Sequence, residues 1–247
     1  MEKKHWLWGK KQKNEDMDSQ FFITDFTNQA YTKAWQVARE KRKEMLEQLG
    51  KDPFILRETP YNILQYVGKI CWSLRELVAD MAGIGKEFLS VSLFYKLETG
   101  PDEKWKQITE NGECITADLE DYMKQKGTVF YRWLNEGRPY IYILDKPKSI
   151  LRGEYRPDQR DAMFDNEGSV LGMKMDFENI GKTYVQGILV ISVYGRDFIA
   201  VDNSCRRWGK CFEYVMAYDI LPYFRQLFQT ELGMLYMETV KKDDERR

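Results

Sequence analysis

The chain has 247 residues, of which 43% are hydrophobic and 31% charged, so it can bury one sizeable core. Its 38 Lys and Arg residues balance 39 Asp and Glu residues, giving a formal net charge of -1, which disfavours nucleic acid as the main partner. The longest apolar run, residues 187–194, is far shorter than the roughly 20 residues that cross a bilayer. We therefore expect no insertion in a membrane.

The N-terminal segment, MEKKHWLWGKKQK, is basic but has no apolar stretch of the kind that signal peptides carry. We therefore expect a cytoplasmic protein with reduced thiols. Two of the four cysteines, Cys205 and Cys211, are flanked by cations in CRRWGKC. Nearby cations can lower the pKa of a thiol and make it reactive. The alternative is two ordinary thiols in a turn.

Residues 1–20 are charged and without pattern, and we interpret them as a basic flexible tail. Residues 21–58 are interpreted as an N-terminal helical extension, with a helix from Phe21 to Leu49 that ends at Gly50. Glycine is the common residue just after a helix end, because it adopts the left-handed conformation there without strain.

A second helix is predicted from Pro60 to Gly83 or Gly85, with Thr59 as its N-terminal cap. Apolar residues recur along it at spacings of three and four, which is typical of a helix with a broad buried face. These residues are Leu64, Val67, Cys71, Leu74, Val78 and Met81.

Alternating apolar residues then predict an antiparallel sheet. Strands are expected at residues 88–97, 105–109, 139–144, 169–177 and 183–193, with one more at residues 198–201. Between them, helices are expected from Thr116 and at residues 130–135. A long amphipathic helix to about Val240 precedes a charged tail at residues 241–247. Helices that bracket an antiparallel sheet give an α+β fold.

A dense polar segment, LRGEYRPDQRDAMFDNEGS, separates these strands and is the candidate ligand site. Loops set against the edge of a rigid sheet commonly carry small-molecule sites. Arg156 and Arg160 can fork onto a phosphate or carboxylate, with Tyr155 stacking beneath a ring. Side chains that can bind ligand amides or hydroxyls are Asp158, Asp161, Asp165 and Asn166.

The alternative for this segment is that Arg160 pairs with Asp161 or Asp165 and only orders the loop. Arg196 follows a core strand in VYGRDF, which places it at a pocket rim; the alternative is a plain surface arginine. The single histidine, His5, lies in the tail and no CxxC pair occurs, so no metal or cofactor is expected. Nucleophilic catalysis lacks a histidine base in the folded region, so we expect no enzyme.

The order of elements resembles that of the GAF domain, a small-molecule-sensing α+β module. A helix leads directly into FLSVSLFYKL, and a short strand precedes the polar segment. The hairpin SVLGMKMDF…YVQGILVISVYGRDF is similar to the paired core strands of the module, and the helix ILPYFRQLFQTELGMLY returns against the first. The resemblance covers about residues 61–236, within a domain that we place at residues 59–240.

The resemblance implies a sheet of about six strands, terminal helices over one face, and a ligand pocket on the other face beneath central helices and loops. It also implies dimerisation through the terminal helices. The NKFDE-type motif of cyclic-nucleotide-binding members is absent, and none of the four cysteines lies in residues 151–198. The identity of a ligand therefore does not carry over. No output domain is visible, which points to a separate partner protein.

The function expected from the sequence is a non-enzymatic sensory or regulatory domain that binds a small molecule, a partner protein or both, as a homodimer. One alternative is a ligand-free interaction scaffold, or a subunit of a larger complex, that works through the helix at residues 21–49 and the tail. The other is a thiol redox enzyme of methionine-sulfoxide-reductase type, for which the resemblance implies Cys114 as the pocket thiol.

Overall fold

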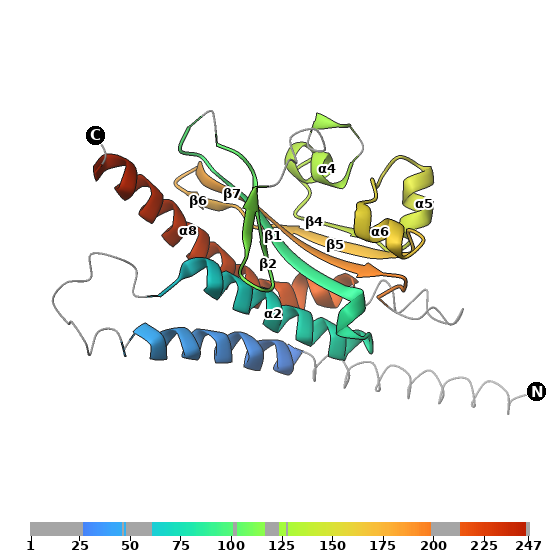
Figure 1. The fold of residues 1–247 in the computed structure, drawn as a ribbon, viewed down its shortest axis with the longest axis horizontal. Coiled ribbons are helices and arrows are strands. Elements are labelled where there is room, and N and C mark those ends of the chain that lie inside the picture. Colours follow the sequence, from blue (N-terminus) through green and yellow to red (C-terminus); the bar gives the residue numbers. More distant parts are fainter. Residues whose placement is uncertain are drawn as a thin grey trace, which may run out of the picture.

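The computed structural model describes residues 27–45, 47, 61–100, 103–116, 124–126, 128–198 and 213–245. In this part of the chain, helices cover both faces of one open antiparallel sheet (Figure 1). The sheet has seven strands in the order β3-β2-β1-β7-β5-β4, and the short β6 pairs with β7. The predicted α+β class is therefore confirmed, whereas the resemblance to a GAF domain stays a prediction.

The elements follow one another along the chain with short connections. The strands are β1 (Leu89–Leu97), β2 (Lys106–Thr109), β3 (Cys114–Thr116), β4 (Tyr140–Ile143), β5 (Gly168–Lys174), β6 (Phe177–Asn179) and β7 (Lys182–Tyr194). The helices are a helix at residues 27–45, α2 (Ile63–Ala82), the 3-10 turn η1 (Lys86–Phe88), α4 (Val129–Asn135), α5 (Lys146–Leu151), α6 (Gln159–Met163), the π-helical turn η2 (Val215–Ile220) and α8 (Leu221–Glu245).

The long strand β7 is the centre of the sheet, because it pairs with β1 on one side and with β5 on the other. Successive side chains of a strand point to opposite faces of a sheet. Leu89, Val91 and Leu93 of β1 therefore share one face with Leu189 and Ile191 of β7, and all five are buried. This face carries the main hydrophobic core.

Helices α2 and α8 cover that face (Figure 1). Helix α2 begins after Asn62, whose side chain accepts a hydrogen bond from the backbone N–H of Gln65, and ends at Gly83, where φ is 62°. The predicted C-terminal glycine is thus confirmed, and the predicted cap, Thr59, lies outside the described residues. Buried residues along α2 include Leu74, which is fully covered.

The helix at residues 27–45, hereafter the N-terminal helix, lies on the outer side of α2, away from the sheet (Figure 1). The Tyr66 hydroxyl on α2 donates to the carbonyl of Val37 at 2.5 Å. Lys41 forms an ion pair with Glu231 of α8, whose carboxylate is almost fully buried. The Tyr61 hydroxyl also donates to Glu231, at 2.6 Å. These contacts hold the N-terminal helix as a third layer.

The opposite face of the sheet carries a smaller core beneath α4. Trp133 of α4 is fully buried, and its ring lies directly over Gly172 of β5. A Cβ atom at position 172 would be only 1.6 Å from Cζ2 of this ring. The glycine therefore lets a large aromatic ring lie flat against the strand.

Several predicted boundaries differ from the structure. Thr116, predicted to open a helix, is the last residue of β3, and residues 117–123 lie outside the described part. The predicted strand 169–177 is two strands, since β5 ends at Lys174 and β6 begins at Phe177 beside a β-bulge. Most of the strand predicted at residues 198–201 also lies outside the described residues. Helix α5 was not predicted.

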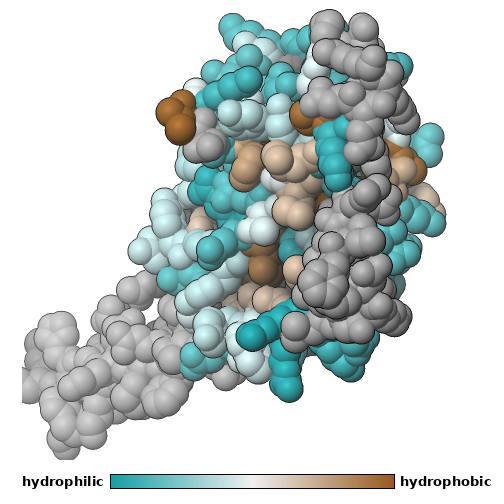
Figure 2. Space-filling view, turned by 90° about the vertical axis from the view of Figure 1, so that its left-hand side faces the viewer, coloured by the Kyte–Doolittle hydropathy of each residue, from teal (hydrophilic) through white to brown (hydrophobic). Residues whose placement is uncertain are grey.

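The end of the molecule where α8 finishes is largely polar. Figure 2 shows a surface dominated by hydrophilic residues, with hydrophobic side chains in a broken strip along the middle. None of the described helices combines the length and hydrophobicity that crossing a bilayer requires.

Replacing Gly172 by Ala should lower the free energy of unfolding by about 1–3 kcal/mol, because Trp133 must leave its position over β5. Urea denaturation of Gly172→Ala would measure this change. Gly100→Ala is the matched control, since a Cβ at position 100 would have no neighbour within 4 Å. Equal unfolding midpoints for the two variants would show that the Trp133 contact does not constrain the fold.

Candidate functional site

A partly open cavity of about 310 Å³ lies between the second face of the sheet and the segments above it. Its floor comes from β1, β2, β5 and β7, and its roof comes from α4 and the segment that precedes α6. The described side chains that line it are Ser90, Ser92, Phe94, Gln107, Thr128, Val129, Phe130, Trp133, Tyr155, Arg156, Asp158, Val170, Val190, Ser192 and Tyr194. This size is at the lower end of that of small-molecule pockets.

The floor of the cavity changes from polar to apolar along the strands. Ser90 of β1 lies opposite Ser192 of β7, and the next pair on the same face is Ser92 with Val190. Phe94 follows on β1, and its ring packs edge-on against Phe130 of α4 with centroids 5.4 Å apart. One end of the cavity is therefore built from hydroxyl groups and the other from aromatic rings.

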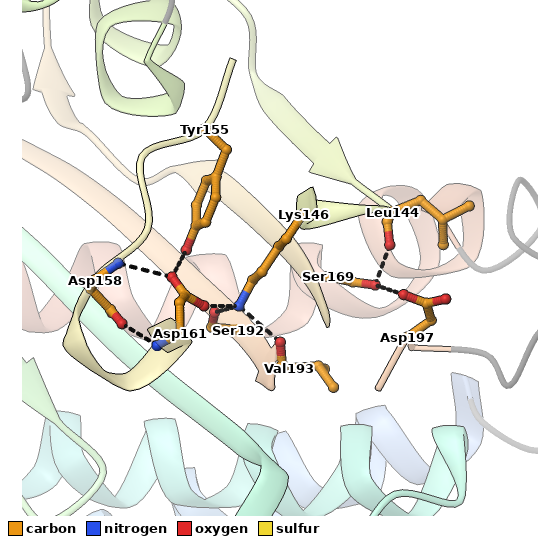
Figure 3. A network of polar contacts seen from close by, with 9 residues as sticks. All are labelled: Leu144, Lys146, Tyr155, Asp158, Asp161, Ser169, Ser192, Val193 and Asp197. Atoms are coloured by element: carbon orange, nitrogen blue, oxygen red, sulfur yellow. Dashed lines mark hydrogen bonds and ion pairs between the residues drawn. The ribbon is translucent and has the colours of Figure 1, made fainter. Parts of the chain in front are cut away.

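A buried ion pair forms the base of the polar end (Figure 3). Lys146 and Asp161 have no solvent exposure, and Lys146 Nζ lies 2.6 Å from Asp161 Oδ1. Lys146 Nζ also donates to Ser192 Oγ at 3.0 Å and to the Val193 carbonyl at 2.9 Å. The three hydrogen atoms of an ammonium group thus have three acceptors.

Asp161 connects this ion pair to the segment over the cavity (Figure 3). Its Oδ2 accepts hydrogen bonds from the Tyr155 hydroxyl at 2.7 Å and from the Asp158 backbone N–H at 3.0 Å. The Asp158 side chain in turn accepts from the Asp161 backbone N–H at 2.8 Å, which completes a capping box at the start of α6. A single buried carboxylate therefore positions both Tyr155 and Asp158.

Local sequence explains how Lys146 reaches this place. Asp145 caps α5, because its side chain accepts from the backbone N–H of Lys148 at 2.9 Å, and Pro147 suits the first turn. Ser169 ties the end of β4 to the chain after β7, since its hydroxyl lies 2.6 Å from the Leu144 carbonyl and 3.2 Å from Asp197 Oδ1 (Figure 3).

Burial changes the acidity of these groups. It lowers the pKa of Lys146 from the ordinary range of a lysine, while the Asp161 carboxylate acts in the opposite direction. Burial, reinforced by the charge of Asp161, raises the pKa of the Tyr155 hydroxyl. The Tyr194 hydroxyl, which is hydrogen-bonded to Ser192 and Ser90, also has its pKa raised by burial. Both tyrosines therefore stay neutral at physiological pH.

The structure brings three of the predicted site residues to the cavity: Tyr155, Arg156 and Asp158. Asp161 lies beneath it in the ion pair. The Arg160 guanidinium donates to the Glu87 carbonyl at 2.9 Å and lies over the Tyr194 ring. The alternative that Arg160 pairs with Asp161 or Asp165 is wrong as to the partner, because Asp161 pairs with Lys146.

The other three predicted residues do not line the cavity. Asp165 and Asn166 form a turn after α6, with φ values of 55° and 60°. Asn and Asp tolerate this left-handed conformation better than other non-glycine residues. The Arg196 guanidinium lies 4.5 Å from the centre of the Phe88 ring. A direct role of these residues in ligand binding stays a prediction.

Sequence reasoning missed several residues of the site. Ser90 and Ser92 carried a signal, since they alternate with apolar residues in FLSVSLFYKL and so share one strand face. Lys146 carried none, because a lysine before a proline and after a strand is an ordinary surface pattern. Its burial depends on Asp161, 15 residues further along the chain.

The contact between Lys146 and Ser192 has the residue types of a Ser–Lys catalytic pair, which the sequence did not indicate. A general base needs a free lone pair on nitrogen. Here Asp161 and two other acceptors favour the ammonium form, so Lys146 acts as a hydrogen-bond donor to Ser192. Among the described residues, no cluster of His, Cys, Asp and Glu has the arrangement of a metal site.

The thiols lie away from the cavity. Cys71 is fully buried in α2, and burial raises the pKa of its thiol, which keeps it protonated. Cys114, the thiol implied for a redox enzyme, begins β3 and lies 3.6 Å from the Tyr95 hydroxyl. It is not among the lining residues. Cys205 and Cys211 lie outside the described residues.

Searches with the sequence found neither a matching protein-family model nor a similar curated protein. The site is therefore interpreted from its own geometry.

Replacing Asp161 by Ala should lower the free energy of unfolding by about 3–5 kcal/mol, because Lys146 would remain buried without its counter-ion. Chemical denaturation measures this loss, with Asp80→Ala on the exposed side of α2 as the control. The double variant Lys146→Met, Asp161→Leu should recover much of it, since no charge is then left buried. Equal stability of Asp161→Ala and Asp80→Ala would contradict this role of the ion pair.

Proposed function

We propose that this chain is a cytoplasmic, non-enzymatic sensory or regulatory domain of GAF-like type that binds a small molecule over the second face of its sheet. The observation that carries the proposal is the cavity of about 310 Å³, which the described side chains of the protein line but do not fill. An interaction scaffold without a ligand needs no such cavity. A ligand site needs one, with a few polar groups that fix orientation.

The rigid polar wall supports binding further. Tyr155 and Asp158 reach the cavity from a segment held by the buried Asp161 carboxylate. A side chain fixed in advance loses less conformational entropy when a ligand binds. The segment is thus both ordered by an internal ion pair and available to a ligand.

Strands β1 and β7 connect the cavity to the terminal helices. Ser92 and Ser192 face the cavity, whereas their neighbours Leu93 and Val193 lie in the core against α2 and α8. A small shift of either strand on ligand binding would change the packing of those helices, since close-packed cores transmit strain. We propose that the signal leaves the domain by this route, toward a partner protein.

The outer surface of the terminal helices supports a role in assembly. Tyr31 and Trp35 of the N-terminal helix are 57% and 51% exposed, although aromatic side chains of this size are usually covered. Tyr31 packs edge-on against Tyr223 of α8, with ring centroids 5.9 Å apart. Exposed aromatic residues are enriched at protein interfaces. This favours a partner protein or a homodimer here, and it is also the observation behind the scaffold alternative.

Native mass spectrometry of freshly purified protein tests the binding proposal. We expect a small-molecule adduct that disappears on denaturation and is absent from Val190→Phe, because the larger side chain enters the cavity. Leu151→Phe adds similar bulk at an exposed position outside the cavity and should keep the adduct. Circular dichroism would confirm that both variants fold.

Two outcomes of this experiment count against binding in the cavity. Wild-type protein without any adduct would favour the scaffold. An adduct that persists in folded Val190→Phe would place the ligand elsewhere. The same spectra report whether the chain is a monomer or a homodimer.

A further inference from the structure

The cavity also contains information about the kind of molecule that it fits. This step rests on the proposed binding function and asks which chemistry the lining selects. Three properties of the described lining decide it: its charge, the direction of its hydrogen bonds, and the position of its aromatic rings.

The charge of the lining is balanced. Among the described lining residues, Arg156 and Asp158 carry the formal charges, one of each sign. Behind them, the Lys146 ammonium is neutralised by Asp161. Bringing an anion into a partly buried cavity without excess positive charge costs free energy, because the anion loses its water. The lining therefore disfavours phosphates and carboxylates and favours an uncharged molecule.

The hydroxyl groups of the floor are arranged as hydrogen-bond donors. Lys146 Nζ donates to Ser192 Oγ, which leaves the Ser192 hydroxyl hydrogen to continue toward Tyr194 and Ser90. Gln107 Nε2 donates to Ser92 Oγ at 3.0 Å, so the hydrogen of Ser92 is also free to donate. A donor-rich floor of neutral groups matches a neutral acceptor, such as a carbonyl oxygen.

The aromatic rings lie at the other end. Phe130 packs edge-on against both Phe94 and Trp133, with centroids 5.4 Å apart in each case. Phe94 follows Ser92 by two residues on the same strand face. Two residues of a strand span roughly 6–7 Å. A single flat molecule can therefore place a ring between the aromatic side chains while its polar group reaches the serines.

We propose that the cavity binds an uncharged aromatic molecule with a carbonyl acceptor, its ring against Phe94 and Phe130 and its carbonyl oxygen on the hydroxyl of Ser92. Gln107 and Asp158 offer acceptor oxygens at the same end, which suit an amide N–H of such a molecule.

Three small probes of nearly equal size separate the contributions. Benzamide carries both the ring and the neutral carbonyl, benzoate replaces the amide by a carboxylate, and cyclohexanecarboxamide keeps the amide but lacks the aromatic ring. Their affinities for dialysed full-length protein at pH 7 can be measured by ligand-observed NMR titration. Benzamide should bind at least about tenfold more tightly than benzoate and severalfold more tightly than cyclohexanecarboxamide.

Variants of the protein test the two contacts separately. Ser92→Ala should weaken benzamide about fivefold to tenfold through loss of one hydrogen bond. Phe130→Leu should reduce the preference for benzamide over cyclohexanecarboxamide. Ser149→Ala on α5 is the control, because Ser149 does not line the cavity, and it should bind as the wild type does.

The inference is overturned if benzoate or cyclohexanecarboxamide binds as tightly as benzamide, or if Ser92→Ala leaves the affinity for benzamide unchanged. Failure of the ligand class differs from failure of the binding function. If no probe binds but native spectra contain an adduct that Val190→Phe abolishes, the cavity binds a molecule of another class. If no probe binds and no adduct occurs, the binding function fails as well.

Discussion

The buried ion pair between Lys146 and Asp161 is the interaction on which the candidate site depends. Burying two charges is costly, and their attraction offsets this only where the remaining hydrogen-bonding atoms also have partners. Here Lys146 Nζ has three acceptors and the Asp161 carboxylate accepts from three donors. One such pair joins α5, α6 and the end of β7. It thereby fixes a segment of the chain that has little hydrophobic core of its own.

The two faces of the sheet show how one set of strands serves both stability and binding. On β1, Leu89, Val91 and Leu93 lie in the main core, whereas the alternate positions carry Ser90 and Ser92. Serine side chains are too small to fill the space beneath α4, and they leave hydroxyl groups at its floor. The main core supplies the stability that allows this second face to remain incompletely packed. The result is a rigid floor under an open cavity.

The sequence predicted the elements that depend on local patterns. The apolar spacing of α2, the alternation in β1 and the glycine at position 83 were sufficient for the α+β class, which the structure confirms. Contacts between distant residues were beyond that reasoning. The polar segment was predicted as a site, yet its internal pairing was wrong, because the counter-ion of Asp161 is Lys146 in an unpredicted helix. The two serines of β1 were visible in the pattern, but their function depends on Ser192 and Tyr194, about 100 residues away.

Hydrogen exchange in Lys146→Met tests most directly whether the ion pair builds the wall of the site. The backbone N–H groups of Asp158 and Asp161 form the capping box that the buried carboxylate holds in place. We expect residues 155–166 to exchange much faster than in the wild type, while the paired amides of β5 and β7 stay protected. Unchanged protection of residues 155–166 would contradict the account, because the wall would then be ordered without Lys146.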